Sequence, residues 1–323
     1  MTDARSRSRW YWVIAGALYG LAMRFGFGWG PQGFSGVMSF AFLVLTPFVV
    51  GAISIYGGRH ERQSLAALIF RPWMAIFLML AGCAVTLLEG FICIAMLTPL
   101  FLVMSSLGGF AMGTALRLAR LSRSSLPALL SLPLLVSAGE AWLPLPSRVL
   151  EVTHAVEVNA PPAVVWQQIV EARDIRAEEL PLTIAHVIGV PKPLEGVNQP
   201  TPQGEVRFSK WERGVAFLGH VTRKVEPESI AWRYAFEAHS FPPGSMDEHV
   251  AIGGRYFDLY DTAFNLHALP GERTRLEVIA HYRVTSSINF YAVPASQILG
   301  HDFVAMLLAL YKNRSERAFS AGA

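Results

Sequence analysis

At residues 156–166 the sequence reads Val-Glu-Val-Asn-Ala-Pro-Pro-Ala-Val-Val-Trp, and this segment decides how the second half of the chain folds. Residues 151–158, which lead into it, alternate between apolar and polar side chains as a half-buried strand does. Asn159 is a suitable residue to cap a helix, and proline is tolerated in the first helical turn. The segment therefore predicts a strand that leads directly into a short helix, whose apolar side carries Val165 and Trp166.

Further along the chain, strand patterns alternate with turn signals. The predicted strands are 204–210, 215–225, 229–237, 256–268 and 273–285. Leu269-Pro270-Gly271-Glu272 is a strong hairpin signal, whereas residues 171–203 are rich in proline and charge and give no assignment. Residues 292–319 repeat apolar side chains at helical spacing, and their most apolar part, Phe303–Leu310, is too short to cross a membrane. Residues 147–323 thus predict an α+β domain, a curved antiparallel sheet covered by a long C-terminal helix.

Aromatic side chains gather on shared faces of the predicted strands. If the terminal helix stands off the sheet, these residues line a cavity between the two; if it does not, they form a packed core. The candidate lining residues are Trp232, Tyr234, Phe236, Tyr256, Tyr260, Phe264, Tyr282 and Phe303. The pattern alone is compatible with both arrangements.

The opening segment resembles the START/Bet v 1-like (SRPBCC) superfamily, in particular its polyketide cyclase/dehydrase and lipid-transport members. In those proteins an alternating strand is followed by Ala-Pro and by a helix that carries Val-Trp. Later similarities are Tyr260-Asp261-Thr262, the hairpin at Gly271, Tyr282-Arg283 and residues 312–316. The resemblance covers residues 147–323, and it implies a helix-grip fold that encloses an apolar cavity for a lipid, sterol, polyketide or other hydrophobic ligand.

Candidates for catalysis are few. A cyclase-like site would use a strand-borne histidine or aspartate inside the cavity as general acid or base. His220 and Asp258 share strand faces with apolar or aromatic neighbours, so they are the inward-facing candidates. The alternative is that both are structural residues on the solvent face. Arg233 or Arg283 would hold an anionic group of the ligand.

The sequence contains no recognisable metal or cofactor motif. Eight of the nine histidines follow residue 150, but no two have a metal-ligand spacing such as His-x-x-x-His. A phosphate-binding glycine loop, Cys-x-x-Cys and Gly-x-Ser-x-Gly are also missing. Cys83 and Cys93 both lie in apolar stretches, which excludes a disulfide framework. We therefore expect no metal and no cofactor, and ligand binding rather than catalysis.

The first half is a different kind of sequence. Residues 1–150 hold eleven Arg or Lys and only four acids, a net charge of +7, whereas the rest of the chain has a net charge of −4. A helix needs about 20 mostly apolar residues to cross a bilayer. We therefore expect a transmembrane helical domain over residues 1–146 with about five spans, at 10–25, 36–56, 72–92, 98–117 and 126–142. Gly108, Gly109 and Gly113 indicate close helix packing in the fourth span.

Arginines in the short loops predict the orientation, because they favour the cytoplasmic side. The clusters are Arg5, Arg7 and Arg9, then Arg59, Arg62 and Arg71, then Arg117, Arg120 and Arg123. All three fall on one side, so we expect a cytoplasmic N-terminus and a second domain outside the cytoplasm. If residues 126–142 only lie on the membrane surface, the second domain is cytoplasmic. Glu89 is either a functional ionisable group or a headgroup residue at the end of a span.

Three functions fit these features. The first is a membrane-anchored protein that binds or transfers a hydrophobic, lipid-like ligand. The second is a membrane-bound enzyme of the cyclase or dehydratase type that acts on such a ligand. The third is a structural or sensory partner of another membrane protein. Expected partners are the lipid bilayer and a hydrophobic small molecule; the basic charge lies in the membrane half and not in a patch with interleaved aromatics, which excludes nucleic-acid binding.

Overall fold

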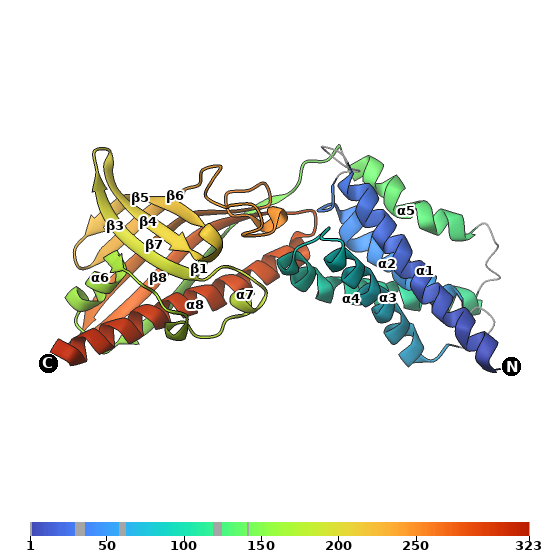
Figure 1. Cartoon of the computed structure of the whole chain (residues 1–323), viewed down its shortest axis with the longest axis horizontal. Helices are drawn as coiled ribbons and strands as arrows, with labels where there is room; N and C mark the ends of the chain where they lie inside the picture. The colour runs from blue at the N-terminus through green and yellow to red at the C-terminus, as the bar shows by residue number, and fades with distance from the viewer. Residues whose placement is uncertain (1, 30–35, 58–62, 119–124, 141, 323) are drawn as a thin grey trace. The chain divides into compact units, whose positions relative to one another are not determined.

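The computed structural model of the chain describes residues 2–29, 36–57, 63–118, 125–140 and 142–322. It divides into two compact units, Met1–Pro146 with Ser286–Ile288, and Ser147–Thr285 with Asn289–Ala323. We call them the helical unit and the sheet unit, and each is described by itself (Figure 1). Of the predicted loop arginines, Arg59, Arg62, Arg120 and Arg123 lie outside the described residues.

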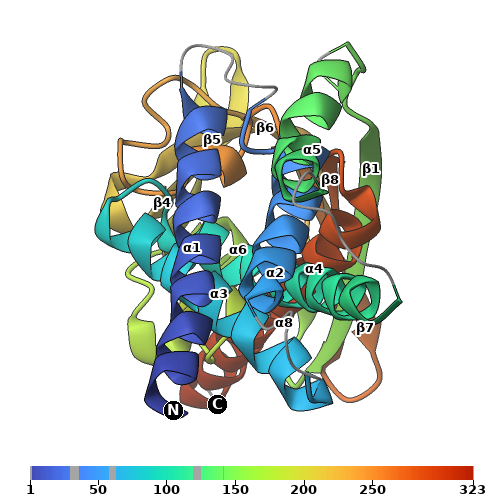
Figure 2. The same ribbon diagram turned by 90° about the vertical axis from the view of Figure 1, so that its right-hand side faces the viewer.

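The helical unit has a helix at each of the five predicted stretches. They are α1 (Thr2–Gly28), the π-helical segment η1 (Ala41–Leu45) that continues into α2 (Thr46–Tyr56), α3 (Leu65–Val85), α4 (Phe91–Leu118) and α5 (Ser125–Glu140). Figure 2 shows α1 running beside α2. By length and composition α3 and α4 are able to cross a membrane, whereas Ala41–Tyr56 and Pro127–Glu140 are apolar but shorter. The number of spans stays a prediction.

The third and fourth predicted spans, 72–92 and 98–117, have the wrong boundaries. α3 begins seven residues before Pro72, and α4 begins eight residues before Pro99, so both prolines lie inside helices. Sequence reasoning treated them as helix starts, but packed neighbouring helices compensate for the backbone hydrogen bonds that a proline removes. Glu89, expected inside the third span, consequently lies in the turn between α3 and α4.

Glu89 forms an ion pair with Arg24 of α1. The Arg24 Nε lies 2.5 Å from the Glu89 Oε1, and both side chains are largely buried. The same guanidinium also donates a hydrogen bond to the Leu88 carbonyl. A charge removed from water needs such a partner. The pair therefore gives each of these two largely buried charges an opposite one.

α2 and α4 cross with their backbones in contact. A Cβ added at Gly51 of α2 would collide with the carbonyl oxygen of Ser105, and one added at Gly108 of α4 would collide with that of Phe48. Only glycine leaves room for such an approach. The close packing that the glycines predict in the fourth span is confirmed.

The sheet unit is an eight-stranded antiparallel sheet that curls into a half-barrel (Figure 1). Its strands are β1 (Ser147–Val158), β2 (Glu171–Ala172), β3 (Pro193–Thr201), β4 (Gly204–Trp211), β5 (Ala216–Val225), β6 (Ser229–Ala235), β7 (Phe257–Leu269) and β8 (Arg273–Thr285). The order across the sheet is β1-β8-β7-β6-β5-β4-β3-β2. The helices are α6 (Pro162–Val170), α7 (Ile184–Val187) and α8 (Asn289–Gly322). β2 and β3 lie in the stretch that the sequence left unassigned.

The segment at 156–166 forms the strand and helix that its sequence predicts. β1 ends at Val158, and α6 begins at Pro162 and buries Val165 and Trp166. Asn159 does not cap α6, however. Its backbone and side-chain nitrogens instead donate to one carboxylate oxygen of Glu316 in α8, at 2.9 and 3.0 Å. The residue thus ties the end of β1 to the terminal helix.

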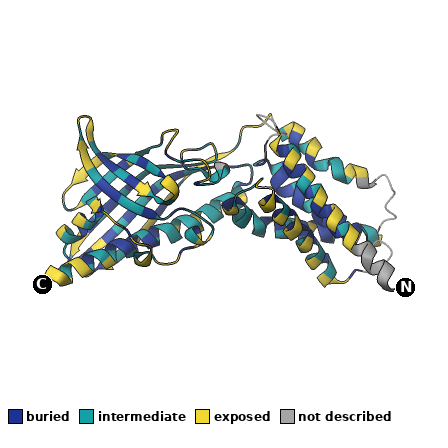
Figure 3. Cartoon of the chain, in the orientation of Figure 1, coloured by how far each residue is buried: buried dark blue, intermediate teal, exposed yellow. Residues whose placement is uncertain are grey.

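α8 packs against the inner face of the sheet, which is the face that also carries α6. Residues Val304, Leu308, Leu310 and Tyr311 of α8 are buried in one core with residues of β1, β6, β7 and β8. Figure 3 shows the buried residues alternating along these strands. Contrary to the sequence-based expectation, α8 is long and apolar enough to cross a membrane. Its apolar side is nevertheless the cover of the sheet.

Two β-bulges shift which side chains face inward. One lies between Val221 and Arg223 of β5, and the other between Leu259 and Asp261 of β7. A bulge adds one residue to one strand, so the alternation of faces changes phase there and the strand bends. The second bulge matters for the candidate site, because Asp258 precedes it.

Candidate functional site

A series of aromatic rings lines the inner face toward the ends of β4, β5 and β6. Its members are Trp232, Tyr234, Phe217, Trp211, Phe303 and His186. Successive ring centroids lie 6.5, 5.7, 5.3, 5.5 and 6.2 Å apart in that order. We call this the aromatic series. It connects the middle of the sheet to α8, which carries Phe303, and to α7, which carries His186.

The local sequence explains why the rings gather there. On β6 the alternation directs Ile230, Trp232 and Tyr234 to the inner face. Gly219 of β5 lies directly opposite Tyr234, and a Cβ at this glycine would press against the Trp232 ring. The missing side chain therefore makes the space that the indole occupies.

Some rings of the series are enclosed and yet remain accessible to solvent. Trp232 is only 3% exposed and Phe217 is also buried. Tyr234, Trp211 and Phe303 keep an intermediate accessible surface. Burial raises the pKa of the Tyr234 phenol, whose oxygen lies 3.0 Å from the Thr262 hydroxyl.

Several polar atoms of the series have no partner among the described residues. The indole N–H of Trp232 and both ring nitrogens of His186 are buried without a hydrogen bond. Burial lowers the pKa of His186, and nearby Lys192 lowers it further. A buried donor that lacks an acceptor costs about 1–3 kcal/mol. The indole N–H, which donates, and the imidazole, which in its neutral form donates from one nitrogen and accepts at the other, are the polar groups that the series offers to a bound molecule.

Arg207 of β4 places a positive charge beside the series. It is 4% exposed and donates to the Ile169 carbonyl (2.7 Å), the Asn198 side chain (3.0 Å) and the Tyr311 hydroxyl (3.0 Å). Its guanidinium carbon lies 4.6 Å from the centre of the Trp232 ring. Within the described chain no carboxylate forms an ion pair with it. All its partners are neutral, so the charge is buried without an opposite one.

Sequence reasoning missed Arg207 for a physical reason. Its neighbours Val206 and Phe208 are apolar, and an isolated strand pattern would direct them to the core and the arginine to solvent. In the structure Arg207 pairs with Gly219 on the inner face, while Val206 and Phe208 pair with outer-face residues of β5. No signal in the single sequence distinguishes these two registers.

The two catalytic candidates lie on the outer face. His220 is exposed and pairs across the strand with exposed Arg233, because Phe217, Gly219 and Val221 are the inward residues of β5. The prediction that His220 faces inward, toward the cavity, was therefore wrong. Both faces of this strand carry apolar residues, so alternation did not decide between them.

Asp258 is displaced from the inner face by the bulge in β7. It pairs with Arg283 of β8, with 3.8 Å between carboxylate and guanidinium, and burial raises the pKa of Asp258 although Arg283 lowers it. Tyr260 is the extra residue of the bulge and has no cross-strand partner. The inward placement of Asp258 was wrong, and neither Arg233 nor Arg283 faces the aromatic series.

The other predicted lining residues divide into two groups. Phe264 and Tyr282 belong to the buried core with Trp232, and Phe236, just after β6, stacks on Tyr234 with centroids 5.8 Å apart. Tyr256 lies before β7, where its ring contacts His249 at 6.2 Å. That any of these residues touches a ligand stays a prediction.

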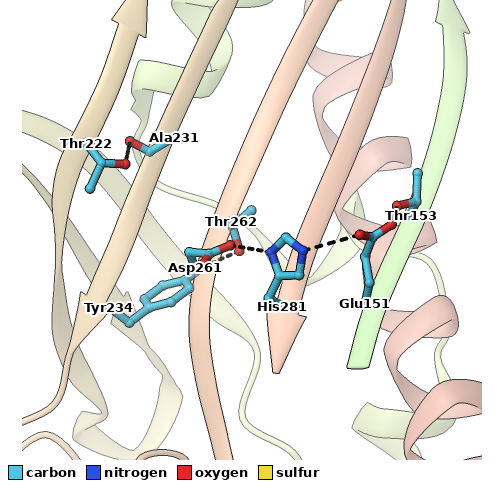
Figure 4. Close-up of polar contacts among 8 residues, drawn as sticks. All are labelled: Glu151, Thr153, Thr222, Ala231, Tyr234, Asp261, Thr262 and His281. Atoms are coloured by element: carbon cyan, nitrogen blue, oxygen red, sulfur yellow. Dashed lines mark hydrogen bonds and ion pairs between the residues drawn. The ribbon is translucent and has the colours of Figure 1, made fainter. Parts of the chain in front are cut away.

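The outer face carries a separate polar network (Figure 4). His281 of β8 binds Asp261 of β7 through Nδ1 at 2.7 Å and Glu151 of β1 through Nε2 at 3.2 Å. The hydrogen bond with Asp261 raises the pKa of His281, and Glu151 acts in the same direction. In the part of the chain that the structure describes, no group of His, Cys, Asp and Glu has the arrangement of a metal site.

Comparison with known proteins gives structural similarities at low sequence identity. No protein family and no curated protein matches the chain in sequence. The Zhui aromatase/cyclase from Streptomyces sp. R1128 is 18% identical with a TM-score of 0.34, over 55% of this chain and 99% of that one. A START superfamily protein from Mycobacterium smegmatis is 15% identical with a TM-score of 0.35, over 52% and 98%. A norcoclaurine synthase point mutant from Thalictrum flavum is 11% identical with a TM-score of 0.31, over 54% and 99%.

At these TM-scores the similarities carry no further argument. The fold that the sequence resemblance implied is nevertheless the fold of the sheet unit, as its strand order and the position of α8 show directly. The helix-grip architecture therefore rests on this chain's own topology.

Proposed function

We propose that the chain is a membrane-anchored protein whose sheet unit binds or transfers a hydrophobic, lipid-like ligand between the sheet and α8. The observation that carries this proposal is the aromatic series on the inner face, in which Tyr234, Trp211 and Phe303 keep accessible surface. This accessible aromatic surface is where an apolar ligand would lie. Aromatic walls with a few polar groups are typical of small-molecule sites.

The polar groups define the kind of ligand. The unpartnered indole N–H of Trp232 and the buried guanidinium of Arg207 are close together, since the two side chains stack at 4.6 Å. An oxygen of the ligand near them would accept a hydrogen bond and would remove the cost of an unpaired buried donor. The expected ligand is therefore an apolar body that carries at least one oxygen acceptor.

We further propose that all five helices of the helical unit cross the membrane, with the N-terminus in the cytoplasm and the sheet unit outside it. The helix in doubt was α5. Its last residue, Glu140, accepts hydrogen bonds from the backbone N–H groups of Phe40 (2.6 Å) and Ala41 (3.0 Å), and its Leu130 carbonyl accepts one from the Tyr19 hydroxyl (2.8 Å). These bonds favour α5 as a member of the bundle rather than a helix on the surface.

The enzymatic alternative loses its support from particular residues, because His220 and Asp258 both lie on the outer face. Binding is the function that the inner face supports best.

Native mass spectrometry of the full chain, purified from its host in detergent, tests the proposal. We expect a reproducible adduct whose extracted component is hydrophobic and contains oxygen. The same preparation of Tyr234→Ala should retain less of it, whereas Thr222→Ala, a change on the outer face, should retain as much as the wild type. A chain that carries no adduct, in detergent and in nanodiscs of host lipid, would refute the proposal.

A further inference from the structure

Two stretches of the sheet unit are free of charge and expose apolar side chains. Residues 180–191 and 289–301 contain no Asp, Glu, Lys or Arg. In the first stretch Leu182 is 87% exposed, and Ile184 and Val187 are more than half exposed; in the second, Ile298 of α8 is also more than half exposed. We call these four residues the apolar rim.

The apolar rim is one surface because α7 is held on α8. Asp302 of α8 accepts hydrogen bonds from the N–H groups of Ile184 (2.7 Å) and Ala185 (3.3 Å). His186 and Phe303, the next residues of α7 and α8, bring their rings to 6.2 Å. Ile298 precedes Asp302 by four residues, so it lies one turn away on the same side of the helix.

The geometry points to a lipid bilayer as the partner of the apolar rim. Adjacent exposed apolar residues without charge mark an interaction surface. The two stretches offer no charged side chain for pairing with a protein partner, whereas the hydrocarbon region of a bilayer requires none. By contrast, the exposed valine at the hairpin between β5 and β6, Val225, lies between Lys224 and Glu226, as expected for a surface that stays in water.

Chain connectivity gives an independent argument for the bilayer. Ile288 belongs to the helical unit, which carries the candidate spans α3 and α4, and α8 begins at the next residue. Ile298 follows ten residues later, which is about 15 Å along a helix. The apolar rim is therefore covalently confined to the neighbourhood of helices that we place in the membrane, and to this extent the inference rests on the proposed function.

The position of the apolar rim also suggests a role. α7 carries both Val187 of the rim and His186 of the aromatic series, and α8 carries both Ile298 and Phe303. A ligand that leaves the bilayer at the rim would meet the series next. The docking itself does not require a ligand.

Site-specific fluorescence in vesicles tests the inference on the full chain. Leu182→Cys and Ile298→Cys are labelled with an environment-sensitive dye, the two original cysteines being buried. The protein is reconstituted into phosphatidylcholine vesicles with or without brominated acyl chains, which quench a dye only on contact. Both labels should lose most of their fluorescence in brominated vesicles, whereas a label at Val225→Cys should lose none.

Two further variants separate the possible failures. A label at Phe77→Cys, exposed on α3, reports whether the helical unit is in the bilayer. If Phe77 is quenched and the rim labels are not, the docking inference is overturned while the anchored binder stands; if Phe77 is not quenched, both fail. Leu182→Asp should reduce quenching at Ile298 and leave ligand retention by native mass spectrometry unchanged, whereas Val225→Asp should have no effect. Energy transfer between labelled copies without quenching by bromine would indicate a protein partner and would also overturn the inference.

Discussion

On the outer face of the sheet, Asp261 lies 2.7 Å from His281 and Asp258 lies 3.8 Å from Arg283, whereas on the inner face Arg207 has only neutral partners among the described residues. Matched charges on a wet surface contribute little, since water already solvates each of them. A buried cation without an opposite charge is costly unless something compensates for it. The comparison teaches that the two faces hold charge differently: the outer face pairs opposite charges, whereas the inner face, where we propose that the ligand binds, holds a cation with neutral acceptors and an aromatic ring.

The largest difference in stability should appear when an arginine on each face is replaced in turn by methionine. Arg207→Met keeps the packing on Trp232 but removes three hydrogen bonds, and we expect it to lower the free energy of unfolding by about 3 kcal/mol. For a unit of this size that corresponds to about 6–12 °C in the apparent Tm of the solubilised chain. Arg233→Met on the outer face should change stability by less than about 0.5 kcal/mol. Equal shifts for the two variants would break the comparison.

The next effect concerns the space on the inner face. Gly219→Ala puts a methyl group against the Trp232 ring, and we expect a loss of about 1–3 kcal/mol from overpacking, measured by thermal unfolding. The added methyl group presses on the indole of Trp232. The double variant Gly219→Ala/Trp232→Leu should therefore lose less unfolding free energy than the two single variants lose together. If the losses in unfolding free energy were strictly additive, the added methyl group would not be in steric conflict with the indole.

A smaller effect distinguishes two hydroxyl groups, both drawn in Figure 4. Tyr234→Phe leaves the buried Thr262 hydroxyl without its partner and should lower the free energy of unfolding by about 1 kcal/mol. Thr222→Val removes an exposed 3.3 Å bond to the Ala231 carbonyl and should cost nothing measurable. Differential scanning fluorimetry of the two variants makes the comparison, and a larger loss for Thr222→Val would contradict it.

The smallest effect is a pH dependence of the outer face. Asp261 raises the pKa of His281 in the folded chain above its value of about 6.5 in the unfolded chain. The stabilisation is therefore complete below about pH 6.5 and is lost as the pH rises through the higher folded pKa. Since the histidine is 40% exposed, we expect His281→Gln to cost less than about 1 kcal/mol at pH 6 and nothing at pH 9. A loss that grows with pH would reverse the assigned sign.

The sequence was sufficient for features that depend on neighbouring residues. The strand and helix at 156–166, the hairpin at 269–272 and the five apolar helices all follow from local patterns of apolar residues, proline and glycine. The long terminal helix was predicted for the same reason. Asn159 is the exception, because its partner Glu316 lies at the far end of the chain.

The candidate site depended on contacts that no local pattern records. The bulge at Leu259/Asp261 reverses the phase of β7, so Asp258 faces outward although its spacing from Phe264 suggests otherwise. Arg207 is buried only because α6, β3 and α8 each bring an acceptor to it. The aromatic residues were easier to identify, since their size alone directs them to the interior.

The glycine contact between α2 and α4 limits how the helical unit is able to move. At Gly51 and Gly108 the obstacle to an added methyl group is a carbonyl oxygen of the opposite helix, and backbone cannot rotate away as a side chain does. Sliding or rolling of one helix on the other would drive a neighbouring side chain into that oxygen. The two helices therefore move as a single body, so a rearrangement within the described part of the helical unit would have to involve α1, α3 or α5.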